Sequence, residues 1–210
     1  MLAWRGYLLK PWAKPLVAAF VLSPLAFLIY AALFDERLLG ANPAEALVRD
    51  TGELALRYLC VTLAITPLRV LSGTPQLARF RRMMGLVTYT YAVCHVLAYS
   101  WLDMGFELAD IIDDIPKRPF ILVGFLAFVL LTPLALTSMN AAIKALGAQR
   151  WQLLHKCVYA IAGLAVLHFF WMRAGKQNFG EVSVYAAVLA VLLGWRVWRW
   201  MRQKRLQATS

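Results

Sequence analysis

The chain has 210 residues, of which 61% are hydrophobic and only 16% are charged, and its mean hydropathy is +0.63. Soluble domains run near half apolar and about a quarter charged, so this composition excludes an ordinary soluble fold. The net charge of +11 is spread over the ends of apolar runs rather than gathered on one surface. We therefore expect no nucleic-acid partner and attribute the charge to membrane topology and to attraction by anionic lipid.

Six apolar runs follow one another along the chain, and each is close to the roughly 20 residues that a membrane-spanning helix needs. They cover about residues 15–34, 54–71, 83–102, 119–137, 151–172 and 181–198. The first run is longer than the apolar part of a secretion signal and lacks a small-residue cleavage site, so we expect it to remain as a span. The sequence predicts an all-α integral membrane protein, one six-helix bundle over residues 1–210 with no soluble domain.

The charges predict the orientation of this bundle, because basic residues collect in short cytoplasmic loops. Fifteen of the 22 basic residues fall on one side of the six spans, and all eleven acidic residues fall on the other. The basic side holds Arg5, Lys10, Lys14, Arg69, Arg79, Arg81, Arg82, Lys144, Arg150, Lys156, Arg196, Arg199, Arg202, Lys204 and Arg205. Both termini are therefore predicted to be cytoplasmic.

The histidines lie in or beside predicted spans, where an ionisable group is costly and points to function. His95 precedes the outer Asp103 by eight residues, and His168 precedes Lys176 by eight. Both rings should thus lie about 12 Å inside these charges. Two neutral imidazoles at matched depth on parallel helices could bind one haem iron from opposite sides, which favours electron transfer. The alternative is that each histidine makes a structural hydrogen bond inside the bundle.

His155 lies near the predicted cytoplasmic face, thirteen residues before His168. On an ideal helix this separation turns the two rings to different faces. A kink or local unwinding near Gly163, or binding in different clefts, would be needed for both rings to bind cofactor. The three cysteines show no metal-binding or haem-attachment spacing and are expected to be buried thiols; they are Cys60, Cys94 and Cys157.

Several stretches resemble the ferric-reductase-like transmembrane domain, and most closely its MsrQ (YedZ) family. They are ITPLR (Ile65–Arg69), RRMMGLVTYTYAVCH (Arg81–His95), LALTS (Leu134–Ser138) and LGAQRWQLLHKCVYAIAGLAVLHFFW (Leu146–Trp171). The resemblance implies b-type haem, an associated FMN, and family histidines at the positions of His95, His155 and His168. It also implies a non-catalytic electron-transfer subunit of the bacterial inner membrane. Such a subunit carries electrons from the quinone pool to MsrP, a periplasmic molybdenum-containing partner that reduces methionine sulfoxide in oxidised proteins.

Two departures from the wider superfamily affect this expectation. Its oxidases carry two histidines on each of two spans, whereas the third span here has Arg82 thirteen residues before His95. Arg82 could instead bind a haem propionate, a flavin phosphate or a quinone carbonyl, or serve only as a topology charge, so the sequence leaves one haem or two open. Those oxidases also carry a flavin and nicotinamide domain that we do not expect here. Electrons should therefore arrive from a quinol or a separate flavoprotein, with His155 and Arg82 near their point of entry.

Two other classes of function stay open. A proton or solute transporter could use intramembrane histidines as relays, although we expect no acidic residue inside a span. A structural membrane anchor could carry histidines with no redox role. The connector Leu102–Pro119 has a local charge of −3 and places Ile111 and Ile112 between its acids. It is predicted to be either an outer docking loop for a basic partner or a merely solvated loop.

Overall fold

The computed structural model describes residues 4–175 and 177–208, and all regular structure within them is helical. The long helices are α2 (Ala13–Phe34), α3 (Pro43–Leu71), α4 (Arg81–Leu102), α6 (Pro119–Leu136), α9 (Val158–Ala174) and α10 (Gly180–Ala208). The shorter elements are α1 (Trp4–Tyr7), η1 (Glu36–Leu39), η2 (Pro75–Phe80), α5 (Leu108–Lys117), α7 (Asn140–Leu146) and α8 (Ala148–His155). The prediction of an all-α fold is confirmed for this part of the chain.

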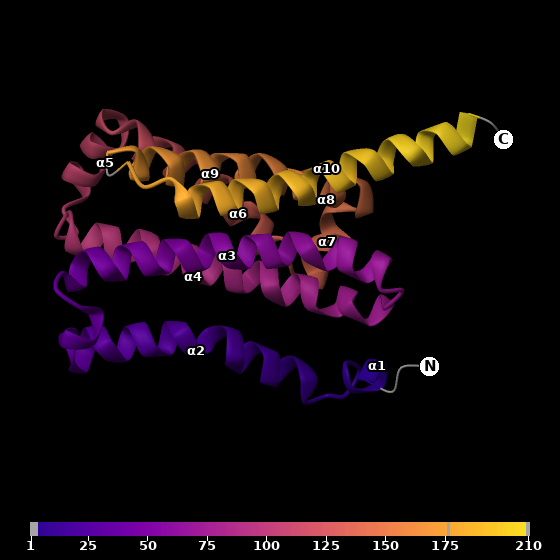
Figure 1. The fold of residues 1–210 in the computed structure, drawn as a ribbon, viewed down its shortest axis with the longest axis horizontal. Helices are drawn as coiled ribbons and strands as arrows, with labels where there is room; N and C mark the ends of the chain where they lie inside the picture. The colour runs from indigo at the N-terminus through magenta and orange to yellow at the C-terminus, as the bar shows by residue number, and fades with distance from the viewer. Residues whose placement is uncertain (1–3, 176, 209–210) are drawn as a thin grey trace.

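Five helical segments are long and apolar enough to cross a membrane: α2, α3, α6, α8 together with α9, and α10. The remaining long helix, α4, has 22 residues and packs along the length of α3 (Figure 1). It contains several threonines and tyrosines as well as His95, and it is not among the five segments that are apolar enough to cross a membrane. The structure therefore supports a multi-pass membrane bundle with five candidate spans, and a sixth crossing by α4 stays a prediction.

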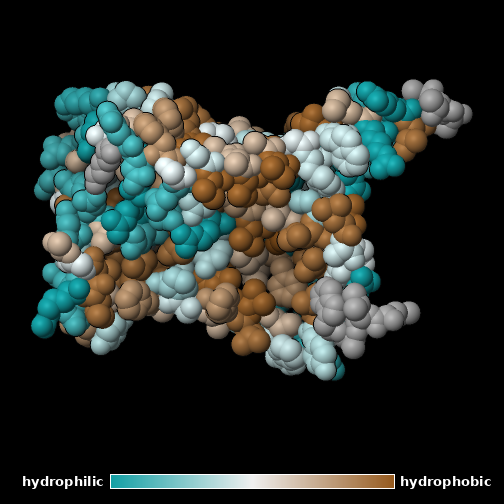
Figure 2. All heavy atoms as spheres, in the orientation of Figure 1, coloured by the Kyte–Doolittle hydropathy of each residue, from teal (hydrophilic) through white to brown (hydrophobic). Residues whose placement is uncertain are grey.

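The helices lie side by side in an elongated bundle, with α2 at one edge, α3 and α4 in the middle, and α6, α9 and α10 beyond them (Figure 1). Helix α5 lies at one end, and α1 and the C-terminal part of α10 lie at the other. Hydrophobic residues gather over the middle of the visible face, and hydrophilic ones gather at the α5 end and along the end of α10 (Figure 2). Large apolar side chains such as Phe20, 77% exposed, face outward, as lipid contact requires.

Helix α3 begins at Pro43 rather than near residue 54. Asn42 caps its first turn, because the Asn42 side-chain oxygen accepts a hydrogen bond from the Glu45 amide at 3.2 Å, and Pro43 is preorganised for the first helical position. Glu45, Asp50 and Glu53, which precede the predicted start of the second span, are therefore helical. With 29 residues α3 is longer than the roughly 20 that a span needs, so the absence of acidic residues inside a span stays a prediction.

Two other predicted boundaries also change. The connector Leu102–Pro119, predicted to be a loop, contains α5. Helix α10 continues to Ala208 instead of ending near residue 198, so the basic C-terminal segment up to Ala208 is helical.

A buried tyrosine joins α2 to α4 at the point where a proline disturbs α2. Pro24 lies inside α2, and the hydroxyl of Tyr91 enters the helix beside it. This hydroxyl donates to the Val21 carbonyl at 2.9 Å and accepts from the Leu25 N–H at 3.1 Å. In a regular helix those two groups would form a backbone hydrogen bond with each other. The Tyr91 hydroxyl is inserted between them and replaces that bond.

We expect Tyr91→Phe to destabilise the bundle, because it leaves a buried carbonyl and a buried N–H without their partner. The loss should be about 1–3 kcal/mol and should appear as a lower melting temperature of the purified protein in detergent. Tyr89→Phe is the matched control, since Tyr89 lies on the same helix and its ring stacks on Phe128. Equal melting temperatures for the two variants would contradict a bridging role for Tyr91.

Candidate functional site

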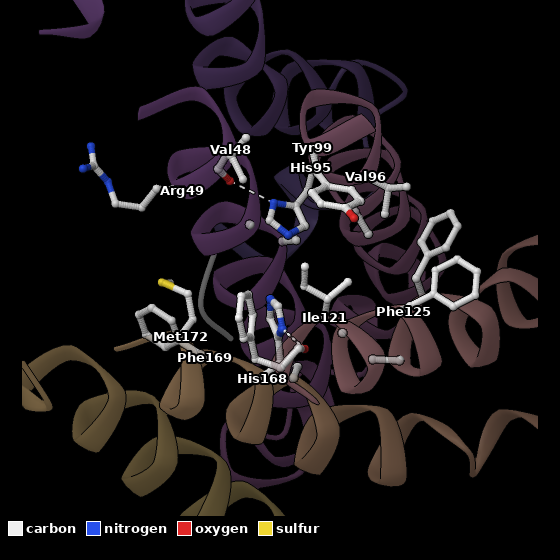
Figure 3. Close-up of a pocket in the computed structure, with 18 of the residues that line it drawn as sticks. Val48, Arg49, His95, Val96, Tyr99, Ile121, Phe125, His168, Phe169 and Met172 are labelled. Carbon is white, nitrogen blue, oxygen red and sulfur yellow. Dashed lines mark hydrogen bonds between the residues drawn. The ribbon is translucent and has the colours of Figure 1, made fainter. Parts of the chain in front are cut away.

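A cavity of about 450 Å³ lies between α3, α4, α6 and α9, at the end of the bundle where α5 lies. Its wall is mainly apolar and includes Leu56, Leu131 and Ile161, and α5 contributes Ile111 and Ile115. His95 from α4 and His168 from α9 also line it (Figure 3). The cavity thus combines a mainly apolar wall with two imidazoles that enter from different helices.

The two imidazoles are held by the same kind of hydrogen bond. The Nδ1 atom of His95 lies 2.8 Å from the Val48 carbonyl of α3, and that of His168 lies 2.6 Å from the Phe120 carbonyl of α6. A carbonyl only accepts, so each Nδ1 carries the proton and donates it. The other ring nitrogen, Nε2, then keeps its lone pair. Figure 3 shows this second nitrogen of each ring directed toward the other ring.

The spacing of the rings suits two ligands of one metal atom. Their centres are 6.1 Å apart and their planes make an angle of 74°. A ligating imidazole nitrogen lies about 2.0 Å from its metal and the ring centre about 1.1 Å further, so opposed axial imidazoles have centres about 6 Å apart. A zinc-type site needs three or four ligands, and no such group of His, Cys, Asp or Glu occurs in residues 4–175 and 177–208. A metal held in a macrocycle needs only the two axial ligands.

The position of the two rings along the bundle follows from where their acceptor carbonyls lie, near the first residues of α3 and α6. Val48 lies in the second turn of α3, and Phe120 lies in the first turn of α6. His95 and His168 are therefore both near the α5 end. Lys176, from which the depth of His168 was predicted, lies outside the described residues.

The other two predicted site residues, His155 and Arg82, lie elsewhere. His155 ends α8, with its Nδ1 at 3.0 Å from the Trp151 carbonyl and its ring stacked on Trp151 at 3.9 Å. Arg82 donates to the Asn140 side-chain oxygen at 2.7 Å. It lines a second cavity, of about 340 Å³, between α2 and α4. The structure thus brings His95 and His168 together and places neither His155 nor Arg82 among the described residues of their cavity.

The break that separates His155 from His168 is not where the sequence suggested. Helix α9 runs without interruption through Gly163, from Val158 to Ala174. The chain instead turns at Lys156 and Cys157, between α8 and α9. His155 therefore belongs to a separate short helix.

Two arginines on the cavity wall were not predicted from the sequence. Arg49 donates from its Nε to Asp50 at 2.9 Å, and Arg173 donates to Glu181 at 2.6 Å. The Nε of Arg173 is buried and has no hydrogen-bond partner among the described residues. An arginine with a spare buried donor can bind a carboxylate of a cofactor. The sequence carried no signal for this role, because both arginines resemble ordinary charges at span ends.

Known proteins are similar to this chain over most of its length. A family model described as "Ferric reductase like transmembrane component" matches residues 51–166. A Polaromonas naphthalenivorans (strain CJ2) protein named "Protein-methionine-sulfoxide reductase heme-binding subunit MsrQ" is 66% identical over 210 residues, covering 98% of this chain and 95% of the relative. The chain belongs to the MsrQ family. A Ralstonia nicotianae protein of the same name is 50% identical over 190 residues, covering 89% and 88%.

A third MsrQ relative, from Herminiimonas arsenicoxydans, is 46% identical over 198 residues, covering 94% of this chain and 90% of the relative. No solved structure matches the chain. The segment matched by the family model includes His95 and His155 and ends two residues before His168. The resemblance to the MsrQ family inferred from the sequence motifs is confirmed.

In this MsrQ chain a cluster of polar contacts fixes α5 at the mouth of the cavity. Asp114 accepts a hydrogen bond from the Tyr99 hydroxyl at 2.6 Å and from the Arg118 Nε at 2.7 Å. The bonds from Arg118 are the main reason that the pKa of Asp114 lies below its usual value. Asp113 pairs with Lys117 one turn later. Two of the acids predicted for docking are thus paired within α5 or its C-cap.

We expect Asp114→Asn to lower the melting temperature at pH 7. The depressed pKa means that the carboxylate stabilises the folded chain above its ordinary pKa of about 3.9, and this contribution disappears as the pH falls through the lower folded value. The effect should be roughly 2–4 °C, because a partly solvated pair contributes of order 1 kcal/mol. Asp110→Asn, at an exposed position of the same helix, is the control. A deficit that stays constant from pH 7 to pH 3 would show that the ion pair is not its cause.

Proposed function

We propose that this chain is a haem b electron-transfer subunit of a methionine sulfoxide reductase system, with His95 and His168 as the two axial ligands of one haem. The observation that carries the proposal is the pair of facing Nε2 atoms, with ring centres 6.1 Å apart. The matched relatives are named heme-binding subunits of such a system. A haem in this site would supply reversible one-electron exchange at its iron. With both axial positions filled, the site would leave no position open for oxygen.

The residues around the pair have separate tasks in this proposal. The Val48 and Phe120 carbonyls hold the Nδ1 protons and so fix the ring orientation. The apolar wall excludes water, which keeps the polarity around the iron low. Arg49 and Arg173 would bind the acidic edge of the cofactor, with the buried Nε of Arg173 as one donor.

The proposed topology has six crossings, with α4 as the additional one, in a bacterial inner membrane. An even number of crossings is supported by the position of α1 and of the C-terminal part of α10 at the same end of the bundle (Figure 1). Fifteen basic residues belong to that side by the sequence assignment. Basic residues mark the cytoplasmic side, so we place both termini in the cytoplasm and α5 in the periplasm.

The proposed donor is a quinol of the membrane pool or a flavin such as FMN. The cavity between α2 and α4 supports an entry point near Arg82, because Lys14 also lines it beside the apolar Leu22, Leu86 and Val87. Cationic donors next to an apolar wall suit a quinone carbonyl with its lipid tail, or a flavin phosphate. His155 lies in a different part of the bundle, and its place in electron entry stays a prediction.

A histidine relay for protons and a structural anchor were the competing functions. A relay needs ring nitrogens that exchange protons with other titratable groups. The Nδ1 protons of His95 and His168 instead point at backbone carbonyls, which cannot pass a proton on. A structural anchor has no need for two imidazoles whose Nε2 lone pairs face each other across an apolar cavity. Both features favour electron transfer.

The ligation can be tested by replacing each histidine with alanine and measuring the haem content and the Soret band of the purified protein. His95→Ala and His168→Ala should each lose most of the haem, because each removes one of only two protein ligands. His155→Ala is the control and should keep the wild-type content and spectrum. Full haem content with an unchanged spectrum in His95→Ala would exclude the proposed pair.

The proposed exit is the α5 end, toward a periplasmic molybdenum-containing subunit, MsrP. Asp103, Glu107 and Asp110 are exposed there, whereas Asp113 and Asp114 are paired with Lys117 and Arg118. Exposed carboxylates close to the cavity can steer a partner that is basic around its own redox centre. On α5, Ile111 lines the cavity, while Ile112 is 61% exposed and available for contact.

Replacing Glu107 with Gln and Asp110 with Asn together should slow electron delivery to that partner by about tenfold at low ionic strength. The difference should shrink as salt is added, because screening removes the steering in both proteins. The measurement is the rate at which the reduced, haem-loaded protein is reoxidised by the partner. Glu36→Gln, at an exposed acid of η1, is the control. A rate and salt dependence equal to wild type would place docking elsewhere.

A further inference from the structure

Each imidazole of the pair lies directly against a glycine of the neighbouring helix. A Cβ atom added to Gly52 of α3 would lie 2.8 Å from both Nδ1 and Cε1 of His95. A Cβ atom added to Gly124 of α6 would lie 2.7 Å from Nδ1 and 2.8 Å from Cε1 of His168. Real Cβ atoms essentially never approach so closely, so either ring would have to move if its glycine gained a side chain.

The place of each glycine follows from the carbonyl that its histidine uses. Gly52 comes four residues after Val48, and Gly124 comes four residues after Phe120. In an α-helix the carbonyl of residue i points along the axis toward the N–H of residue i+4. A ring that reaches this carbonyl from the side must therefore lie over residue i+4. Only a residue without Cβ leaves that approach open.

The same arrangement occurs twice, on two different pairs of helices. In α3 and α4 the histidine follows its carbonyl by 47 residues, and in α6 and α9 by 48. Both carbonyls lie in the first two turns of their helices. Other glycines inside helices differ: Gly85 has its nearest neighbouring atom at 3.9 Å from an added Cβ, and Gly163 has none within 4 Å. The close approach is thus specific to the two glycines beside the imidazole pair.

We propose that Gly52 and Gly124 are positioning residues that set the hydrogen bond of each axial imidazole, and through it the retention and the midpoint potential of the haem. The inference rests on the proposed ligation by His95 and His168. A hydrogen bond from Nδ1 to a carbonyl raises the basicity of Nε2 and orients the ring. A more basic ligand favours oxidised iron and so lowers the potential. An added methyl group pushes the ring away from its carbonyl and weakens both effects.

The test compares Gly52→Ala and Gly124→Ala with Gly85→Ala and Gly163→Ala, each purified and loaded with haem. Alanine favours a helix over glycine at all four positions, so helix propensity alone would not weaken any of the variants. We expect the haem affinity of the first two to fall roughly 10- to 100-fold. Their remaining haem should have a more positive midpoint potential than wild type. Gly85→Ala and Gly163→Ala should match wild type in both measurements.

The outcomes separate this inference from the proposed ligation. If His95→Ala keeps its haem with the wild-type spectrum, the ligation fails and the inference fails with it. If the histidine variants lose their haem while Gly52→Ala and Gly124→Ala match Gly163→Ala in affinity and potential, the ligation stands and the positioning role is overturned.

A second pair of variants tests the positioning role of Gly52 if Gly52→Ala fails to fold. His95→Gly opens space for free imidazole, which can bind the iron in place of the lost ring. With added imidazole, the double variant Gly52→Ala/His95→Gly should show a more positive midpoint potential than His95→Gly alone, because its methyl group blocks the carbonyl. Equal potentials for the two proteins would overturn the role of Gly52.

Discussion

The donation of each imidazole Nδ1 proton to a helix carbonyl is the contact on which the rest of the site depends. A buried neutral imidazole has one N–H, and leaving it unpaired is costly. Pairing it with the Val48 or Phe120 carbonyl fixes the tautomer and the ring plane together. The opposite nitrogen must then face the cavity. Two such contacts, made from different helix pairs, produce the facing arrangement without any side-chain partner.

The scaffold around this pair keeps the two acceptor helices in place. Helix α3 packs along α4, and α6 packs along α9, so each histidine and its carbonyl belong to helices in direct contact. Tyr91 lies one turn before His95 on α4 and inserts its hydroxyl into α2. The bonds from Tyr99 and Arg118 to Asp114 fix α5 beside the cavity. Packing and polar contacts therefore restrain α4 on both sides of His95.

The sequence alone was sufficient for the helical class and for the prediction that His95 and His168 lie close together, because long apolar runs and rare intramembrane histidines are strong local signals. The early start of α3 carried a signal that was overlooked, in Asn42 and Pro43 as cap and first residue. The amphipathic spacing of Leu108, Ile111, Ile112 and Ile115 likewise indicated α5. The sequence contained no signal for the carbonyls that accept the imidazole protons. They are backbone atoms of distant segments, and the side chains of Val48 and Phe120 do not encode them.

The position of the imidazole pair near α5 has an electrical consequence. In the proposed orientation, an electron that enters beside α1 and reaches these rings has already crossed much of the bilayer. A bacterial membrane is negative inside, so this outward displacement of negative charge is driven by the membrane potential. A full crossing at 100 mV corresponds to about 2.3 kcal/mol for each elementary charge. In that proposed orientation, the off-centre site would let the energised membrane favour reduction on the periplasmic side, even when the donor and the acceptor have similar redox potentials.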